Sequence, residues 1–247
     1  MIDFSIFHKL KEYASLNKND IVLDGGAGLG YLTEFLASRC KKVVAIEKDN
    51  ALVEVMKDQL RDFNNVSIIQ GDLLKIILPK FNKIISIPPY YLSSRLIQWL
   101  FKQQFECAIL IMQQAFAEKL SADSNSEAYS WLTVVTQYNA KIDLLDLVPP
   151  EKFFPKPEVT SKIVRITPWK NPPFKIDNPN LFNIFIKQLF TNRNKKLIKP
   201  VHFFLKDKYQ YSKLDTEKFL SIFSFREKRV RQLLAKEFGE LINALPK

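Results

Sequence analysis

A glycine-rich turn between two short apolar runs constrains the fold of this chain more than any other feature. Residues 21–47 read IVLDGGAGLGYLTEFLASRCKKVVAIE. Branched apolar residues begin and end the segment, and Leu29, Leu32 and Leu36 recur between them at helical spacing. The order of strand, glycine turn, helix and second strand, closed by the acid Glu47, is typical of a nucleoside-binding βαβ unit.

The spacing of the glycines favours a single nucleoside over a dinucleotide. A dinucleotide-binding turn has the pattern Gly-x-Gly-x-x-Gly. This turn instead has Gly26-x-Gly28-x-Gly30, with Tyr31 where the third glycine would stand. Glu47 is placed to accept hydrogen bonds from both ribose hydroxyls. We therefore predict a site for S-adenosylmethionine (AdoMet) rather than NAD; the alternative is an ordinary tight turn followed by an incidental acid.

Two predicted strands, at residues 66–70 and 83–86, are each followed by a candidate site segment. Asp72 follows the first and is placed to accept from the exocyclic amine of a cofactor adenine, unless it only caps a turn. Ile87-Pro88-Pro89-Tyr90-Tyr91 follows the second, and its prolines end the strand and stiffen the loop. The carboxyl ends of parallel strands form the ligand edge of such a sheet. The loop is therefore either a stacking platform for a flat base or a proline turn with packing tyrosines.

The remaining pattern predicts an α/β domain followed by a helical one. We expect helices at 3–16, 50–62, 92–101 and 113–120, strands at 107–111, 131–138 and 159–166, and a loop at 149–157. Residues 168–179, PWKNPPFKIDNP, are proline-rich and polar. We place a domain boundary there, which gives domains 1–170 and 171–247, the second helical over 180–245.

The chain carries a formal net charge of +11 and has a sequence pI of about 9.5. This excess favours a nucleic-acid partner, although solubility alone could account for it. Two basic clusters stand out in the second domain, and we predict that they lie on helical segments as phosphate-binding surfaces; the alternative is solvated helix faces. The clusters are Arg193, Lys195, Lys196 and Lys199, and Arg226, Lys228, Arg229 and Arg231.

The two cysteines, Cys40 and Cys107, lie in apolar contexts, as expected of buried free thiols in a cytoplasmic protein. The two histidines, His8 and His202, are too few and too far apart to suggest a metal site. No apolar run is long enough to span a bilayer, and the first residues do not read as a signal peptide. We predict no metal, no membrane association and a cytoplasmic location.

Several motifs together resemble one family, the KsgA-type rRNA adenine N6,N6-dimethyltransferases, and its archaeal and eukaryotic members most. The similarity runs from about residue 3 to about residue 200. The motifs are VLDGGAGLGYLTEFLA, the acid in VVAIEKD, QGDLL, PPYYLSS, Gln113 and Phe116-Ala117, Tyr129-x-x-Leu132 with Gln137, VPPEKFFPKPEVTSKIV and FTNRNKKL. The Phe-x-Pro-Lys-Pro-x-Val-x-Ser run is far more specific than the glycine turn.

The resemblance implies a Rossmann-like class I AdoMet-dependent methyltransferase sheet with a small helical C-terminal domain. It implies dimethylation of N6 in two adjacent adenosines near the 3′ end of small-subunit rRNA, a role in ribosome biogenesis and action as a monomer. Carried over by motif, the cofactor-binding residues are Gly26, Ala27, Gly28, Glu47, Lys48, Asp72, Leu73 and Ile87. The catalytic loop is Ile87, Pro88, Pro89 and Tyr90, with Tyr90 stacking on the target adenine. The RNA-binding residues are Phe154, Lys156, Arg193, Lys195, Lys196, Arg229 and Arg231.

Four departures from the family pattern leave a second hypothesis open. Ile87 stands where the family has an Asn, Ala115 replaces a Glu, and Ser130-Trp131 replaces Gly-Arg. The family's Gly-Gln-x-Phe-like segment, which closes over the site, would precede Met1. The Asn oxygen is an acceptor for the N6 hydrogens of the substrate, and Ile87 has none. The alternative function is therefore an rRNA-binding ribosome-assembly factor with weakened or no catalysis.

Overall fold

The computed structural model describes residues 3–245, and contacts between Cα atoms divide the chain into two compact units. Unit 1 comprises residues 1–118 and 141–168, and unit 2 comprises residues 119–140 and 169–247. The predicted boundary near residue 170 divides the chain into a methyltransferase domain and an RNA-binding domain, and this functional division stays a prediction. As compact units, however, residues 119–140 group with the C-terminal helices.

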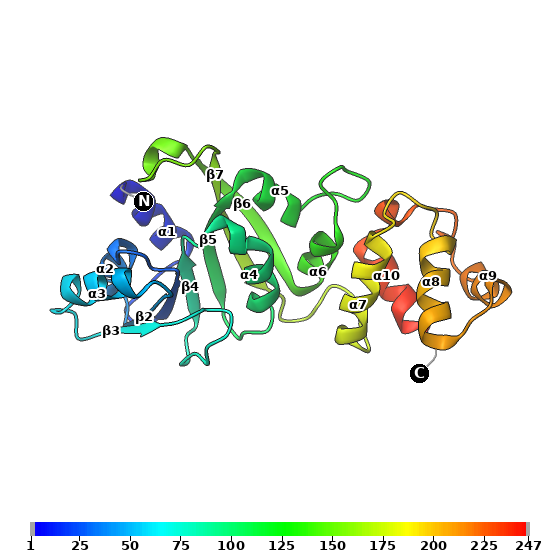
Figure 1. Ribbon diagram of the computed structural model, residues 1–247, viewed down its shortest axis with the longest axis horizontal. Helices are drawn as coiled ribbons and strands as arrows, with labels where there is room; N and C mark the ends of the chain where they lie inside the picture. The colour runs from blue at the N-terminus through cyan, green and yellow to red at the C-terminus, as the bar shows by residue number, and fades with distance from the viewer. Residues whose placement is uncertain (1–2, 246–247) are drawn as a thin grey trace. The chain divides into compact units, whose positions relative to one another are not determined.

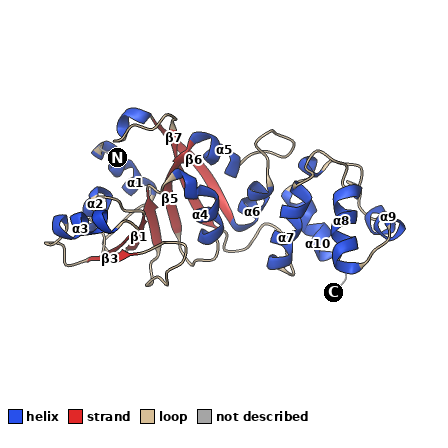
Figure 2. Cartoon of the chain, viewed as in Figure 1, coloured by secondary structure: helices blue, strands red, loops and turns tan. Residues whose placement is uncertain are grey.

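Within residues 3–245, seven strands form one sheet in the order β3-β2-β1-β4-β5-β7-β6. Figure 2 draws the strands in red. The strands are β1 Ile21–Gly25, β2 Lys42–Glu47, β3 Val66–Gln70, β4 Lys83–Ser86, β5 Cys107–Gln113, β6 Ala140–Val148 and β7 Ser161–Pro168. Strands β1 to β5 pair in parallel, whereas β7 is antiparallel to β5. The chain order reverses at β1, which lies between β2 and β4, and in open α/β sheets ligands bind at such a point.

Helices cover the sheet where the sequence places apolar residues at helical spacing (Figure 1). They are α1 Phe4–Tyr13, α2 Tyr31–Ala37, α3 Asn50–Gln59, α4 Ser93–Leu100 and α5 Gln114–Leu120, with short 3-10 turns at Tyr90–Leu92 and Pro150–Lys152. Phe7 and Leu10 of α1 join Phe35 and Leu36 of α2 in one buried cluster with strand residues such as Ile109. This core holds β1 and β2 in place, and with them the turn between β1 and α2.

The segment 131–138, predicted as a strand, is instead helix α6, Trp131–Asn139. Ser130 begins the helix through a capping box in which its side chain and that of Thr133 serve each other's backbone N–H groups. The following strand β6 was not predicted. Its residues Asp143 and Asp146 interrupt the apolar pattern, which an edge strand tolerates because only one side of it is paired.

Unit 2 is helical and has a core rich in phenylalanine. Besides α6 it contains α7 Pro179–Phe190, α8 Ile198–Tyr209, α9 Lys213–Ser221 and α10 Ala235–Asn243, with a 3-10 turn at Val230–Gln232. Phe185 packs edge-on against Phe204 with ring centroids 4.8 Å apart, and Phe190 lies 5.6 Å from Phe238. These contacts join α7 to α8 and to α10.

Most residues of the two basic clusters lie outside α-helices, contrary to the prediction, although Lys199 lies in α8. Arg193 to Lys196 and Arg226 to Arg231 lie in the turns that follow α7 and α9, and an antiparallel bridge joins Lys196 to Arg229. Arg231 N also donates to Arg193 O, at 3.0 Å. The two cationic segments thus pair with each other through their backbones.

Candidate cofactor and substrate site

The glycine turn is closely packed on one side and open on the other. Gly26, Gly28 and Gly30 have φ of +83°, +60° and +86°, in the left-handed region that favours glycine. A Cβ on Gly25 would lie 2.5 Å from the Leu73 side chain, and one on Gly30 would lie 2.7 Å from Met56. At Gly28 no atom would come within 4 Å. The backbone at Gly28 can therefore be approached closely by a ligand.

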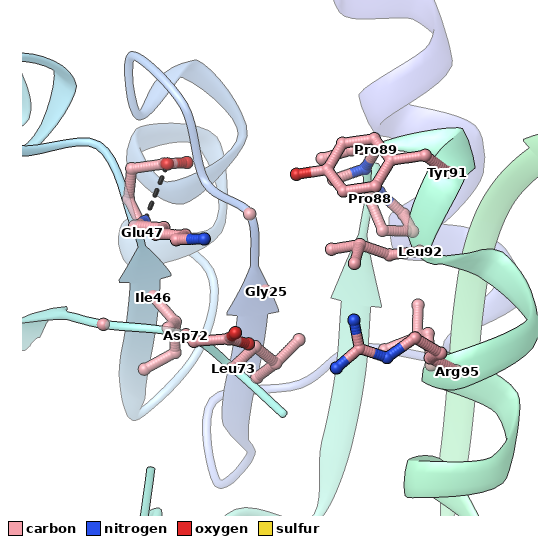
Figure 3. A pocket seen from close by; sticks show the side chains of 14 residues that line it. Gly25, Ile46, Glu47, Asp72, Leu73, Pro88, Pro89, Tyr91, Leu92 and Arg95 are labelled. Atoms are coloured by element: carbon pink, nitrogen blue, oxygen red, sulfur yellow. Dashed lines mark hydrogen bonds between the residues drawn. The ribbon is translucent and has the colours of Figure 1, made fainter. Parts of the chain in front are cut away.

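Glu47 lies at the carboxyl end of β2 and lines a cavity beside the turn. Its Oε1 accepts from Lys48 N at 2.7 Å (Figure 3). The same oxygen accepts from Asp49 N at 2.9 Å, and Oε2 accepts from Gly28 N at 2.9 Å. A carboxylate offers about four acceptor positions, so three of them already serve backbone amides. A ribose that binds Glu47 through both hydroxyls must therefore share or displace the bond from Gly28.

Asp72 lies two residues beyond β3 and lines the same cavity (Figure 3). Its Oδ1 accepts from Leu74 N at 3.0 Å, and its backbone carbonyl accepts from Lys75 N and Ile76 N. The two interpretations of Asp72 are thus compatible, because the residue initiates a turn and also presents its carboxylate to the cavity. Gly26, Lys48 and Leu73 line this cavity as well.

The proline loop faces the glycine turn across the sheet edge. Pro88 and Pro89 line the cavity of Glu47 and Asp72, and a Cβ on Gly26 would lie 3.1 Å from Pro89. The Ser86 hydroxyl, which is buried, donates to Gly25 O at 2.6 Å. This bond ties β4 to β1 and holds the hydroxyl at the buried strand ends, while its oxygen keeps the lone pairs with which a hydroxyl accepts hydrogen bonds.

Tyr90 and Tyr91 have different surroundings. The Tyr90 hydroxyl hydrogen-bonds Ser161 Oγ of β7 at 2.5 Å, and Tyr90 is half-buried. Tyr91 is 80% exposed and lines the Glu47 cavity, whereas Tyr90 lines neither this cavity nor the neighbouring one. The bond to Ser161 fixes the orientation of the Tyr90 ring at the ligand edge.

A second cavity of about 540 Å³ shares Gly26 with the first. Ile87 lines this second cavity, together with Ala27, Gly28 and the 79% exposed Phe154. Ile87 therefore lines a cavity that the carboxylates of Glu47 and Asp72 do not line.

Asp24, which the sequence analysis did not single out, also lines the second cavity. It is 1% exposed, and Thr33 Oγ1 donates to its Oδ2 at 2.7 Å. Burial raises the pKa of the Asp24 carboxyl to about 7, with a smaller contribution from the negative charge of Glu47, while the Thr33 hydrogen bond opposes the rise. An acid inside an otherwise apolar strand, next to a glycine turn, was the signal that could have revealed it.

The residues predicted to bind RNA fall into two places. Phe154 and Lys156 lie in unit 1, where Lys156 pairs with Glu151 at 2.8 Å. The others gather in unit 2 at the bridge between the basic clusters. There Arg193 donates to Ser126 O and Glu127 O, Arg229 donates to Asn194 O, and Lys196 pairs with Glu227 at 3.0 Å. Arg193 and Arg229 thus hold the local fold together.

The described residues contain no helix long and apolar enough to cross a membrane.

Comparison with known proteins identifies the family. A family model described as ribosomal RNA adenine dimethylase matches residues 2–225. A probable ribosomal RNA small subunit methyltransferase A of Methanococcus aeolicus is 39% identical, with 99% of this chain and 93% of the relative covered. The corresponding protein of Methanococcoides burtonii is 41% identical over 80% of this chain and 73% of its own length.

Solved structures agree with this relationship. A dimethyladenosine transferase from Plasmodium falciparum superimposes with a TM-score of 0.86 at 27% identity, covering 98% of this chain and 95% of that one. The 23S rRNA methyltransferase ErmE matches with a TM-score of 0.73 at 23% identity, covering 98% of each chain, and this likeness concerns the fold. The Rossmann-like α/β methyltransferase fold expected from the sequence is confirmed, and the chain belongs to the ribosomal RNA adenine dimethylase family.

Proposed function

We propose that this protein transfers methyl groups from AdoMet to N6 of adenosines in small-subunit rRNA. The names of its relatives indicate methylation of small-subunit rRNA for them, and the family model is described as an adenine dimethylase. The observation that carries the proposal is one cavity at the sheet edge. It joins the carboxylates of Glu47 and Asp72, and it shares Gly26 with the neighbouring cavity, which the open backbone of Gly28 lines. These groups suit a nucleoside with two ribose hydroxyls and an exocyclic amine, so the residues present fit AdoMet.

In this proposal each residue has a distinct task. Gly26 and Gly28 let the ligand approach the backbone, Glu47 holds the ribose, and Asp72 accepts from the adenine amine. When bound, AdoMet supplies a methyl group activated by its sulfonium. The protein must present the substrate N6 to that methyl with its hydrogens accepted by protein oxygens, because the N6 lone pair is otherwise delocalised into the ring.

The acceptors for those hydrogens must come from the proline loop itself. Ile87 has no polar side-chain atom, and the Ser86 hydroxyl is buried and held against Gly25 O. The carbonyls of Pro89 and Tyr90 each accept one hydrogen bond, from Leu92 N and Ser93 Oγ, whereas no group within residues 3–245 donates to those of Ile87 and Pro88. We therefore assign the carbonyls of Ile87 and Pro88 to the substrate amine. The absence of the side-chain acceptor is expected to slow the transfer about a hundredfold relative to a loop with Asn.

Unit 2 is proposed to supply most of the RNA affinity. It holds 18 of the 37 Lys and Arg residues but only 9 of the 26 Asp and Glu residues. A cationic surface of this kind binds the phosphates of RNA without reading its sequence. We propose that the substrate is the immature small ribosomal subunit in the cytoplasm.

The test is transfer of tritiated methyl groups from AdoMet to immature small subunits, with mass analysis of the nucleosides. We expect slow formation of N6,N6-dimethyladenosine by the wild type and faster formation by Ile87→Asn. Glu47→Ala is the matched control and should lose activity in either background. If neither the wild type nor Ile87→Asn incorporates label, the enzymatic proposal is wrong.

The specific observation of Ile87 keeps a second function in view, an rRNA-binding assembly factor that does not methylate. Calorimetry separates the two functions. Binding of AdoMet in the micromolar range supports the enzyme. Tight, salt-dependent RNA binding without detectable AdoMet binding supports the assembly factor.

A further inference from the structure

Arg95 is a charged side chain at the cavity of Glu47 and Asp72 that has no role in the proposed function. Arg95 lies in the first turn of α4, directly after the proline loop. It lines this cavity, and its guanidinium points into it toward Asp72 and Leu73 (Figure 3). Asp72 comes from the opposite wall, just beyond β3. The cavity is therefore bordered by a carboxylate on one side and by a guanidinium on the other.

Arg95 is not held in place by a partner on the protein. Within residues 3–245 its side chain forms no hydrogen bond, no ion pair and no contact with an aromatic ring. Several other arginines of unit 1 are engaged: Arg39 donates to Phe35 O, and Arg165 pairs with Asp143. An exposed arginine next to a cavity, with all five of its donors available to a ligand, is suited to recognition.

The hydrogen-bonding character of the two groups is complementary to one kind of base. A carboxylate can only accept hydrogen bonds and a guanidinium can only donate them. Adenine presents an amine donor at C6, flanked by two ring acceptors, N1 and N7. A purine bound with its amine at Asp72 has a ring acceptor on each side of that amine, and the Arg95 guanidinium points toward Asp72 (Figure 3).

We propose that Arg95 is a specificity-determining residue for the adenine of the methyl donor, to which it donates a hydrogen bond at the ring nitrogen beside the amine. This inference rests on the proposed AdoMet site. In it, Asp72 recognises the amine and Arg95 the neighbouring acceptor. The base is then recognised by one hydrogen-bond acceptor, Asp72, and one donor, Arg95. Asp72 alone would bind any suitably placed amine.

The first experiment measures binding rather than turnover. Isothermal calorimetry with S-adenosylhomocysteine, which carries the same nucleoside and no transferable methyl, compares the wild type with Arg95→Ala. Loss of a hydrogen bond from a charged donor is expected to weaken binding about tenfold. Arg61→Ala is the matched control, because Arg61 is 73% exposed and lies outside the cavity. It should bind like the wild type, and thermal melts should show both variants folded.

The second experiment deletes the ring acceptor from the ligand. Homocysteine conjugates of 1-deazaadenosine and 7-deazaadenosine each replace one flanking nitrogen by a CH group. One of the two should bind the wild type more weakly than S-adenosylhomocysteine does, and it should lose nothing further with Arg95→Ala. If Arg95→Ala weakens both analogues as much as the parent compound, the assigned hydrogen bond does not exist.

The outcomes separate this inference from the function on which it rests. Absence of S-adenosylhomocysteine binding by the wild type would overturn both. Tight wild-type binding that Arg95→Ala changes less than twofold would overturn only the role of Arg95. If Arg95→Ala leaves S-adenosylhomocysteine binding intact but weakens binding of rRNA, the guanidinium contacts a phosphate instead, and the inference is again wrong.

Discussion

The carboxyl of Asp24 makes the stability of the ligand-free protein depend on pH. Burial raises its pKa from the ordinary value of 3.8 to about 7 in the folded chain. Between these two values the unfolded chain loses the proton before the folded chain does, so stability falls as the pH rises from about 4 to about 7 and is level above that. One pKa unit corresponds to about 1.4 kcal/mol, so the loss is at most about 4 kcal/mol.

Asp24→Asn should remove this dependence, since an amide oxygen can still accept from Thr33. Urea denaturation of both proteins from pH 4 to pH 8 measures the difference in unfolding free energy. We expect the unfolding free energy of the variant to increase relative to that of the wild type as the pH rises, with most of the change between pH 5 and pH 7. A difference that does not change with pH would mean that Asp24 stays charged in the fold.

At the residue scale, the sequence predicted which side chains would meet but not how their acceptors are used. Glu47 and Asp72 follow neighbouring parallel strands, and the strand order brings them to one cavity as expected. That Glu47 already binds three backbone amides depends on the exact path of the turn, which residue types do not encode. Arg95 was missed because only the start of α4 at Ser93 turns it toward the cavity.

At the scale of the elements, the turn from β1 into α2 depends on glycines that differ in their surroundings. Gly30 is the N-cap of α2 with φ of +86°, and a Cβ there would lie 2.7 Å from Met56 Cγ. Gly28 has φ of +60°, but a Cβ there would meet no atom within 4 Å. Alanine in the left-handed region costs about 1–2 kcal/mol at either position. Only at Gly30 is a steric contact with a neighbouring helix added.

We therefore expect Gly30→Ala to destabilise the protein more than Gly28→Ala, by about 1 kcal/mol or more. The midpoint of urea denaturation, compared at a common slope, measures this difference. Gly28→Ala is the control because it carries the same backbone strain without the contact. Equal midpoints for the two variants would show that the Met56 side chain moves aside without lowering the stability of the protein.

The elements that the sequence predicted correctly are those with one clear period. The strands at 66–70 and 83–86 and the helix that follows the glycine turn agree with the structure. Residues 131–138 were wrongly predicted as a strand because Trp131, Thr133 and Val135 are spaced two residues apart, as on one face of a strand. The signal that decides for a helix is the N-cap at Ser130. The basic clusters were assigned to helices from local composition, although backbone pairing between segments more than thirty residues apart determines their conformation.

At the scale of the whole molecule, the charge is divided unevenly between the units. Of the 26 acidic residues, 17 belong to unit 1 and nearly balance its 19 basic residues, so almost all of the net charge of +11 belongs to unit 2. RNA binding by a cationic surface releases counterions, and its affinity falls with salt in proportion to the number of phosphates neutralised. The salt dependence of binding should therefore be governed by unit 2.

Two exposed lysines of unit 2 offer the sharpest test of this expectation. Lys195 lies in the turn after α7, and Lys199 lies in the first turn of α8, over the ring of Phe203. Lys195→Ala with Lys199→Ala should lower the slope of log affinity against log salt by about 1 to 2 for single-stranded or hairpin rRNA.

The matched control is Lys41→Ala with Lys80→Ala, which removes the same charge from exposed positions of unit 1. Filter binding between 50 and 300 mM salt, about the range over which such slopes are measured, should show an unchanged slope for the control. Equal losses in both double variants would mean that the net charge of the chain, and not a surface of unit 2, determines its affinity for RNA.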